Sequence, residues 1–293
     1  MAAPHAEFDA AVEPWRRELV GYCYRLLGAW DDAEDAVQET YVRAWRYWDT
    51  FEHRSSVRTW LHRIATRVAF TAMEGRQRRA LPSGLGNSDG FLPWSAWVQP
   101  YADDRDDLRL ALVAGLQTLT PSQRAVLVLR DVFAFPAPEV AELLDVSIGA
   151  VKSTLQRARA RLAREAPRPD DVVEPQDPIA RRQLDAYVKA FETADVGLLT
   201  AVLRADASLE LLPGRRWFDG VAQCVPVLTD AVGAPGDWRM EPVVANGQPA
   251  ARVWLHGEPM GLAVLDSRAD GIASITVFGE PGLVGRFAQP LVE

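Results

Sequence analysis

Cationic and small polar side chains recur along residues 148–162, a segment whose apolar residues return every three or four positions. Lysine and arginine neutralise the phosphates of a nucleic acid, whereas hydroxyl and amide groups hydrogen-bond to base edges in a groove. The segment therefore has the chemistry of a helix that contacts duplex DNA. The side chains expected to make these contacts are Lys152, Ser153, Gln156, Arg157, Arg159 and Arg161.

The elements that would present these side chains form a helix-turn-helix over residues 138–162. The first helix has an apolar side that includes Val140 and Leu143. A short turn follows, and its last residue, Ser147, is a suitable N-cap for a second helix that begins at Ile148. The apolar stripe of the second helix leaves its polar face outward. The alternative is a pair of ordinary surface helices with a basic face.

The composition narrows the classes of protein to which this chain can belong. Its formal charge of -8 over 293 residues is unusual for a free-standing DNA-binding protein, because such proteins draw much of their affinity from a basic surface. Either the basic patches are local or another molecule holds the chain on DNA. Cys23 and Cys224 lie far apart and form no zinc or disulfide pattern. With no apolar run of membrane-spanning length and no leader pattern, we expect a soluble cytoplasmic protein without a membrane partner or a cofactor.

Two helices are predicted before residue 49. The first runs from about Phe8 to Leu27 and ends at Gly28. The second opens at Asp31, with Glu34 placed as the other member of a capping box. Its apolar stripe leaves a mainly acidic face, which on a core helix can simply be solvated. The polar side chains of interest on that face are Asp35, Gln38 and Glu39.

A third predicted helix, from Val57 to about Gly75, carries arginines outside its apolar stripe. Arg58, Arg63 and Arg67 follow one another along it and could track a phosphate backbone. The residues expected to be buried by helical spacing are Val57, Trp60, Leu61, Ile64 and Val68.

Two sets of motifs carry a family resemblance. The first is DAEDAVQETYVRAW (32–45), followed by RTWLHRIATRVAF (58–70) and RQRR (76–79). The second is the helix-turn-helix preceded by LTPSQRAVLVLRDVFAF (119–135). They resemble, in the expected order, region 2 and region 4 of the sigma-70 family of RNA polymerase sigma factors, extracytoplasmic-function (ECF) group.

The resemblance implies a use for each segment. Asp35, Gln38 and Glu39 would dock on the beta-prime clamp helices of core RNA polymerase. The polymerase would then supply much of the DNA affinity that a chain of net negative charge does not have by itself. Region 4 would read the minus-thirty-five promoter element and contact the beta flap. Region 2 would open the minus-ten element and hold an extruded base. The minus-ten residues would be Phe51, Glu52, His53, Arg54, Ser55, Arg58, Arg63 and Arg67.

Three positions depart from the family pattern. Arg67 stands where family members commonly have Asn, and Thr71 and Glu74 replace a usual Asp and Arg. These departures bear on minus-ten specificity and leave the expected fold unchanged.

The chain is predicted to be multidomain, with two all-α sigma domains followed by an α+β cone. Region 2 would occupy residues 8–80 and region 4 residues 105–166, with a linker at 81–104. A second linker, rich in proline and acidic residues, would occupy 167–178 and precede the last domain at 179–293. Apolar side chains in the first linker would pack on a partner surface or on another part of this chain. They are Phe91, Leu92, Trp94 and Trp97.

Residues 179–293 are expected to place helices first and a curved antiparallel sheet after them. The order resembles the SnoaL-like, ketosteroid-isomerase-type (NTF2-like) cone that some ECF sigma factors carry as a C-terminal extension. Predicted helices lie around 180–191, 195–203 and 221–232, and predicted strands at 207–212, 238–245, 250–256, 261–266 and 272–278.

An enzymatic cone would need a buried carboxylate opposite hydrogen-bond donors. Glu210 lies mid-strand, out of phase with Leu209 and Leu211, and faces either the pocket or solvent; His256 is a lone histidine at a strand end. No constellation is recognisable, so we expect no catalysis. Instead we expect a domain that regulates the sigma regions in cis, with a small-molecule ligand as a candidate partner.

The cis contact is expected from aromatic residues of this domain and from its tail at 279–287, unless these aromatics only fill the domain's own core. The aromatics are Trp217, Phe218 and Phe278. Two other functions stay open: a stand-alone helix-turn-helix regulator that never touches polymerase, and an isomerase-like enzyme with an N-terminal DNA-targeting module. The polar helix at 32–45 separates the first of these from a sigma factor.

Overall fold

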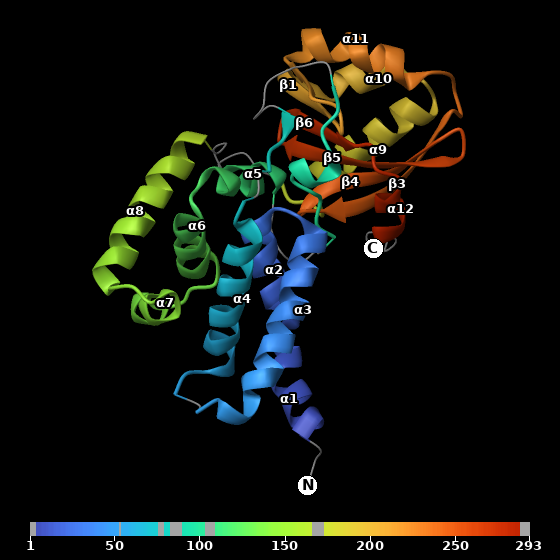
Figure 1. The fold of residues 1–293 in the computed structure, drawn as a ribbon. Coiled ribbons are helices and arrows are strands. Elements are labelled where there is room, and N and C mark those ends of the chain that lie inside the picture. Colours follow the sequence, from blue (N-terminus) through green and yellow to red (C-terminus); the bar gives the residue numbers. More distant parts are fainter. Residues whose placement is uncertain are drawn as a thin grey trace. The chain divides into compact units, whose positions relative to one another are not determined.

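The computed structural model describes residues 4–52, 54–75, 79–82, 90–102, 109–165 and 173–287, which belong to two compact units (Figure 1). The first unit comprises Met1–Arg79 and Ala111–Pro167, and the second comprises Ala80–Leu110 and Arg168–Glu293. The segment between the two sigma regions therefore clusters with the C-terminal domain.

The first part of the first unit consists of helices that correspond to region 2. Pro14 lacks an N–H and lies in a 3-10 turn, Glu13–Trp15, so the single helix predicted over 8–27 is divided in two. Gly28, at a φ of 72°, closes the second of them as predicted, and its N–H donates to Tyr24 O at 2.7 Å. The helices are α1 (Pro4–Val12), α2 (Arg16–Leu27), α3 (Trp30–Tyr47) and α4 (Val57–Met73).

The start of α3 differs from the prediction. Its N-cap is Ala29, and no side chain caps the helix. Glu34 instead lies 2.6 Å from the Arg16 guanidinium, so the predicted capping box is wrong. The Glu34 carboxylate, which a capping box would use, instead forms an ion pair with Arg16 of α2.

Packing between α2 and α4 sets the direction of α4's side chains. Tyr22 and Leu61 are completely buried, and the Tyr22 hydroxyl lies 2.6 Å from Thr66 Oγ1. These contacts occupy one side of α4, so Arg67 is exposed and Arg63 half-buried.

Region 4 forms the rest of the first unit. A capping box at Thr120 opens its second helix: Gln123 N donates to Thr120 Oγ1 at 3.3 Å, and Thr120 N donates to Gln123 Oε1 at 3.1 Å. The predicted helix-turn-helix is confirmed, with Ser147 Oγ accepting from Ala150 N at 3.1 Å. The elements are α5 (Leu110–Thr118), α6 (Pro121–Leu127), a π-helical turn (Val128–Val132), α7 (Ala137–Leu144) and α8 (Ile148–Glu165).

The second unit is built on one sheet with the strand order β2-β1-β6-β5-β4-β3. β1 and β6 pair in parallel and all other neighbours are antiparallel, so the sheet is mixed where an antiparallel one was expected. The strands are β1 (Leu203–Leu212), β2 (Arg216–Asp219), β3 (Trp238–Ala245), β4 (Gln248–Leu255), β5 (Glu258–Arg268) and β6 (Gly271–Phe278). The helices are α9 (Pro178–Glu192), α10 (Val196–Ala201), α11 (Val221–Val232) and α12 (Gly282–Arg286).

The two faces of this sheet have different coverings. Helices α9, α10 and α11 bury one face in a single apolar cluster that includes Leu209 and Ile275. Because side chains alternate along a strand, Phe278 points to the other face. There its ring packs edge-on against Trp94 of the first linker, with centroids 6.0 Å apart. Of the two expectations for the linker's aromatics, packing on another part of this chain holds for Trp94.

Candidate nucleic-acid interface

The outward face of α8 has the geometry of a DNA-reading helix. Val151 and Ala158 are buried beneath it, whereas Lys152, Gln156 and Arg157 are exposed. Ser153 is exposed too. A row of exposed cationic and hydrogen-bonding groups on a capped helix fits a major groove and its flanking phosphates.

Two predicted members of this face are engaged elsewhere. Both carboxylate oxygens of Asp131, in the π-helical turn, accept from the Arg159 guanidinium, at 2.9 and 2.6 Å. This two-bond pair raises the pKa of Arg159. Arg161 is half-buried. Of the four cations predicted for this face, Lys152 and Arg157 are therefore exposed, while the exposed Arg159 is paired with Asp131.

A cleft of about 850 Å³ lies between the end of α3 and the exposed side of α4. It brings together most of the residues predicted for the minus-ten element, from the loop before α4 and from α4 itself. They are Phe51, Glu52, Arg54, Ser55, Arg63 and Arg67. His53 lies outside the described residues.

Aromatic rings form one wall of this cleft. Phe51 stacks on Trp60 with centroids 4.5 Å apart and planes 21° apart. Trp48 stacks on Phe51 at 6.0 Å. Stacked aromatic rings beside arginines are suited to holding an unpaired base.

Sequence reasoning missed several residues that line the cleft. Arg43, Arg46 and Tyr47 come from the last turns of α3, and Tyr47 is 61% exposed. The signal was present, because an aromatic and two arginines just before the predicted base-binding loop have no place in an apolar stripe. Trp60 was assigned to the core but is only half-buried.

Arg58 does not line the cleft. Its Nε lies 2.5 Å from Glu18, its Nη2 donates to Phe133 O at 3.0 Å, and its guanidinium covers the Phe135 ring at 4.2 Å. The predicted phosphate contact of Arg58 is therefore replaced, in this structure, by contacts that join region 2 to region 4.

Region 4 approaches the cleft through α7. Glu142 is among the cleft's lining residues, and the Thr59 hydroxyl donates to the Glu139 carboxylate at 3.1 Å. Both acids are on α7, the first helix of the helix-turn-helix. The Glu142 carboxylate therefore lines the same cleft as Arg63 and Arg67, two arginines that were predicted to contact phosphates.

A buried histidine lies at the centre of this junction. His62 is completely buried, its Nδ1 donates to Arg58 O at 2.9 Å, and its ring contacts Phe133 and Phe135 of region 4. Burial lowers its pKa to about 4, because the imidazolium would lose its hydration. The ring is accordingly neutral at pH 7.

The predicted polymerase-facing residues separate into two groups on α3. Asp35 and Gln38 are exposed, as expected. Glu39 lies 2.6 Å from Arg43 and also lines the cleft. Val42, which is 45% exposed and follows Asp35 and Gln38 at helical spacing, was not predicted. The accessible face is thus a mixed polar and apolar surface.

Among the described residues of the second unit, Glu210, Asp206 and His256 lie in separate environments. Glu210 is buried, and because it alternates with Leu209 and Leu211 it belongs to the sheet face opposite the apolar cluster. Asp206 is exposed and paired with Arg204, and His256 has a 67% exposed side chain. In the part of the chain that the structure describes, no cluster of His, Cys, Asp and Glu could hold a metal ion.

Comparisons with known sequences agree with this arrangement. Residues 11–79 match the family description Sigma-70 region 2, and residues 109–162 match Sigma-70, region 4. The ECF RNA polymerase sigma factor SigG of Mycobacterium tuberculosis is 41% identical over 97% of this chain and 84% of its own length. SigJ of the same organism is 30% identical over 69% of this chain and 63% of its own length.

A solved structure shares the whole fold. The crystal structure of the Mycobacterium tuberculosis sigma factor SigJ covers 96% of this chain and 98% of its own, with a TM-score of 0.64 at 22% identity. The C-terminal unit, helices on one face of a mixed sheet, is the expected SnoaL-like cone. Among the described residues, no helix is long and apolar enough to cross a bilayer. The extent and identity of the match with SigG establish that the chain belongs to the ECF RNA polymerase sigma factors.

Proposed function

We propose that this chain binds core RNA polymerase through α3 and directs it to promoters, with α8 reading the minus-thirty-five element and the α4 cleft holding an opened minus-ten base. The observation that carries this proposal is the cleft, which gathers arginines and stacked aromatic rings from two chain segments. Its chemistry suits an extruded base and its phosphates. A stand-alone regulator would need no such cleft.

The test is transcription from purified components. Core polymerase plus this chain should initiate at specific promoters, whereas core polymerase alone should not. Promoter binding that is independent of core polymerase, without initiation, would favour a stand-alone regulator instead.

The polymerase surface can be tested separately. Asp35→Ala with Gln38→Ala should weaken core binding about tenfold while leaving the fold intact, because both side chains are exposed. The matched control is Glu7→Ala with Asp9→Ala, which removes two exposed acidic groups from α1. Equal core affinity in both double variants would remove α3 from the interface.

We further propose that the C-terminal domain has no catalytic role and regulates the sigma regions in cis, in the cytoplasm where core polymerase acts. The support is that the linker joining region 2 to region 4 packs within the C-terminal unit, as the Trp94–Phe278 contact illustrates. A tethered partner has an effective concentration of about a millimolar, so modest contacts are well populated. Chains ending at Arg168 should differ from the full chain in core-dependent transcription; equal activity and promoter choice would exclude cis regulation.

A further inference from the structure

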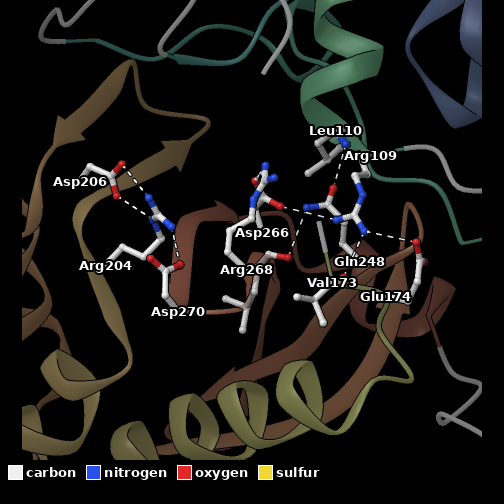
Figure 2. A network of polar contacts seen from close by, with 11 residues as sticks. Arg109, Leu110, Val173, Glu174, Arg204, Asp206, Gln248, Asp266, Arg268 and Asp270 are labelled. Atoms are coloured by element: carbon white, nitrogen blue, oxygen red, sulfur yellow. Dashed lines mark hydrogen bonds and ion pairs between the residues drawn. The ribbon is translucent and has the colours of Figure 1, made fainter. Parts of the chain in front are cut away.

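The chain segments on either side of region 4 meet on the C-terminal sheet. Arg109 precedes region 4 and Val173 follows it, and Arg109 Nη2 donates to Val173 O at 3.1 Å. Val173 N in turn donates to Ser267 O of β5 at 3.3 Å. Figure 2 shows the arginine side chain reaching both the later segment and the sheet. All of these residues belong to the second unit.

Ion pairs of Arg109 stabilise this contact between the two segments and the sheet. The Arg109 guanidinium lies 3.5 Å from the Asp266 carboxylate and 3.9 Å from that of Glu174. The side chains of Arg109 and Asp266 are only 12% and 15% exposed, so solvent screens their attraction less than it would on an open surface. Asp266 is itself oriented by Arg268 at 2.7 Å. Loss of either Arg109 or Asp266 would leave the other charge, which is largely buried, with one counter-ion fewer, and this is costly.

Leu110, the first residue of α5 and a member of the second unit, has its backbone N–H bound by this sheet. The first N–H groups of a helix have no partner within the helix. Leu110 N, at the start of α5, donates to Gln248 Oε1 of β4 at 2.8 Å, and Gln248 Nε2 donates to Leu265 O at 3.2 Å. A residue far along the chain thus serves as the cap that a local serine or aspartate commonly provides.

The hairpin between β3 and β4 extends the same surface toward the linker. Tyr101 N donates to Asn246 Oδ1 at 2.7 Å, and Asn246 N donates to Tyr101 O at 2.9 Å. Asn246 is completely buried. The two-residue turn that closes this hairpin therefore binds backbone of the linker in both directions.

We propose that Asn246, Gln248 and Asp266 form a binding site for three residues of the chain before region 4, namely Tyr101, Arg109 and Leu110. Arg109, once seated there, clasps Val173, which follows region 4. The residues that flank region 4, Arg109 and Val173, are then held at one place within the C-terminal unit. Opening the clasp would release both of them. The regulatory meaning of the clasp rests on the proposed function, but its existence does not.

The experiment is amide hydrogen exchange on the full chain, with no polymerase present. Leu110 and Val173 report the two ends of the clasp, since each donates its N–H to an acceptor on the sheet. Arg109→Ala should raise exchange about tenfold at both amides. Gln248→Ala removes an acceptor used by Leu110 only, yet it should also raise exchange at Val173, because a clasp links the two ends.

The matched control is Arg204→Ala. Arg204 also lies between two carboxylates, Asp206 and Asp270, but its side chain is more exposed than that of Arg109, and both of these partners belong to the domain itself rather than to the linker (Figure 2). It should leave exchange at Leu110 and Val173 unchanged. If Arg109→Ala impairs folding, Arg109→Lys replaces it, since lysine keeps the charge but cannot reach several acceptors with a planar fork.

The clasp is overturned if Val173 exchanges at the wild-type rate in both the Arg109 and Gln248 variants, or if Arg204→Ala has the same effect as they do. If the exchange data support the clasp, the same variants are then assayed in transcription that depends on core polymerase. Altered activity would support regulation by the clasp. Unchanged activity would leave the clasp in place and overturn its regulatory meaning.

Discussion

The two surfaces of the first unit that are proposed to contact DNA differ in what surrounds them. The α8 face is exposed, and its reading groups point outward. The α4 cleft shares its walls with Glu142 of α7, and the neighbouring Arg58 and His62 are occupied by Phe133 and Phe135. The α8 face is therefore open, whereas the cleft is bordered by a carboxylate of region 4. In the free chain, the surface proposed for strand opening thus has region 4 at its edge, while the surface proposed for duplex reading stays accessible.

Phe135→Ala should have the largest effect, because it removes the contact between region 4 and region 2 on which the difference between the two surfaces depends. Phe135 is 1% exposed and lies against Arg58 and His62 of region 2. Its loss should lower the free energy of unfolding of the first unit by about 3–5 kcal/mol, as expected for a buried Phe→Ala. Phe91→Ala, at a site that is 80% exposed, is the control and should change stability by less than about 0.5 kcal/mol. Denaturant unfolding measures both, and equal effects would mean that Phe135 does not join the two regions.

Acid should loosen the same junction. The pKa of His62 is about 4 in the folded chain, against about 6.5 when unfolded. Between these values the unfolded chain binds more protons, so the free energy of unfolding should fall as pH is lowered from 6.5 to 4. The loss in the free energy of unfolding is at most about 3 kcal/mol. The Glu18 carboxylate lies 3.4 Å from His62 Nε2 and stabilises the protonated ring, which makes the loss smaller.

The measurement is unfolding free energy as a function of pH. His62→Gln should flatten the profile in this window, and His256→Gln should not, because the His256 side chain is 67% exposed. An identical slope for all three proteins would show that the junction does not depend on a neutral His62.

On the exposed surface, two neighbouring substitutions should separate base reading from phosphate contact. Gln156→Ala should change preference at single base pairs by about 1–3 kcal/mol. Arg157→Ala should weaken binding to all sequences and reduce the salt slope by about one. Affinity measurements over a set of promoter variants and salt concentrations distinguish these outcomes. If both variants behave alike, the α8 face does not separate residues that read bases from residues that contact phosphates.

The smallest effect concerns Arg159, whose guanidinium is held by Asp131. Asp131→Ala should release the arginine toward the DNA backbone and steepen the salt slope by about one. Adding Arg159→Ala to that variant should remove the gain. A steeper slope that survives the second substitution would come from the lost acidic charge alone.

Local signals predicted the helix-turn-helix and much of the sheet, but not the contacts between distant segments. Ser147 as an N-cap placed the start of α8, and the strands predicted at 238–245 and 250–256 correspond to the antiparallel pair β3 and β4. In contrast, the parallel pairing of β1 with β6 joins strands far apart in sequence, and the four-residue β2 is too short to show a period.

The site shows the same division. Residues just before α4 could be assigned to the cleft because they are consecutive, and the motif placed α4's arginines beside them. The burial of His62 depends on Phe133 and Phe135, some seventy residues later in the chain. Nothing in the local spacing of α4 distinguishes this histidine from a solvent-exposed one, so sequence reasoning passed over it.

The position of region 4 at the edge of the α4 cleft is tested most directly by one distance in solution. Spin labels replace Arg67 and Glu142, which line the same cleft from α4 and α7, while the native Cys23 and Cys224 are buried and stay unlabelled. Pulsed electron-spin measurements then compare the free chain with its complex with core polymerase and promoter DNA. We predict one short, narrow distance in the free chain and a longer one in the complex. A long or broad distance in the free chain, or the same short distance in both states, would contradict the account.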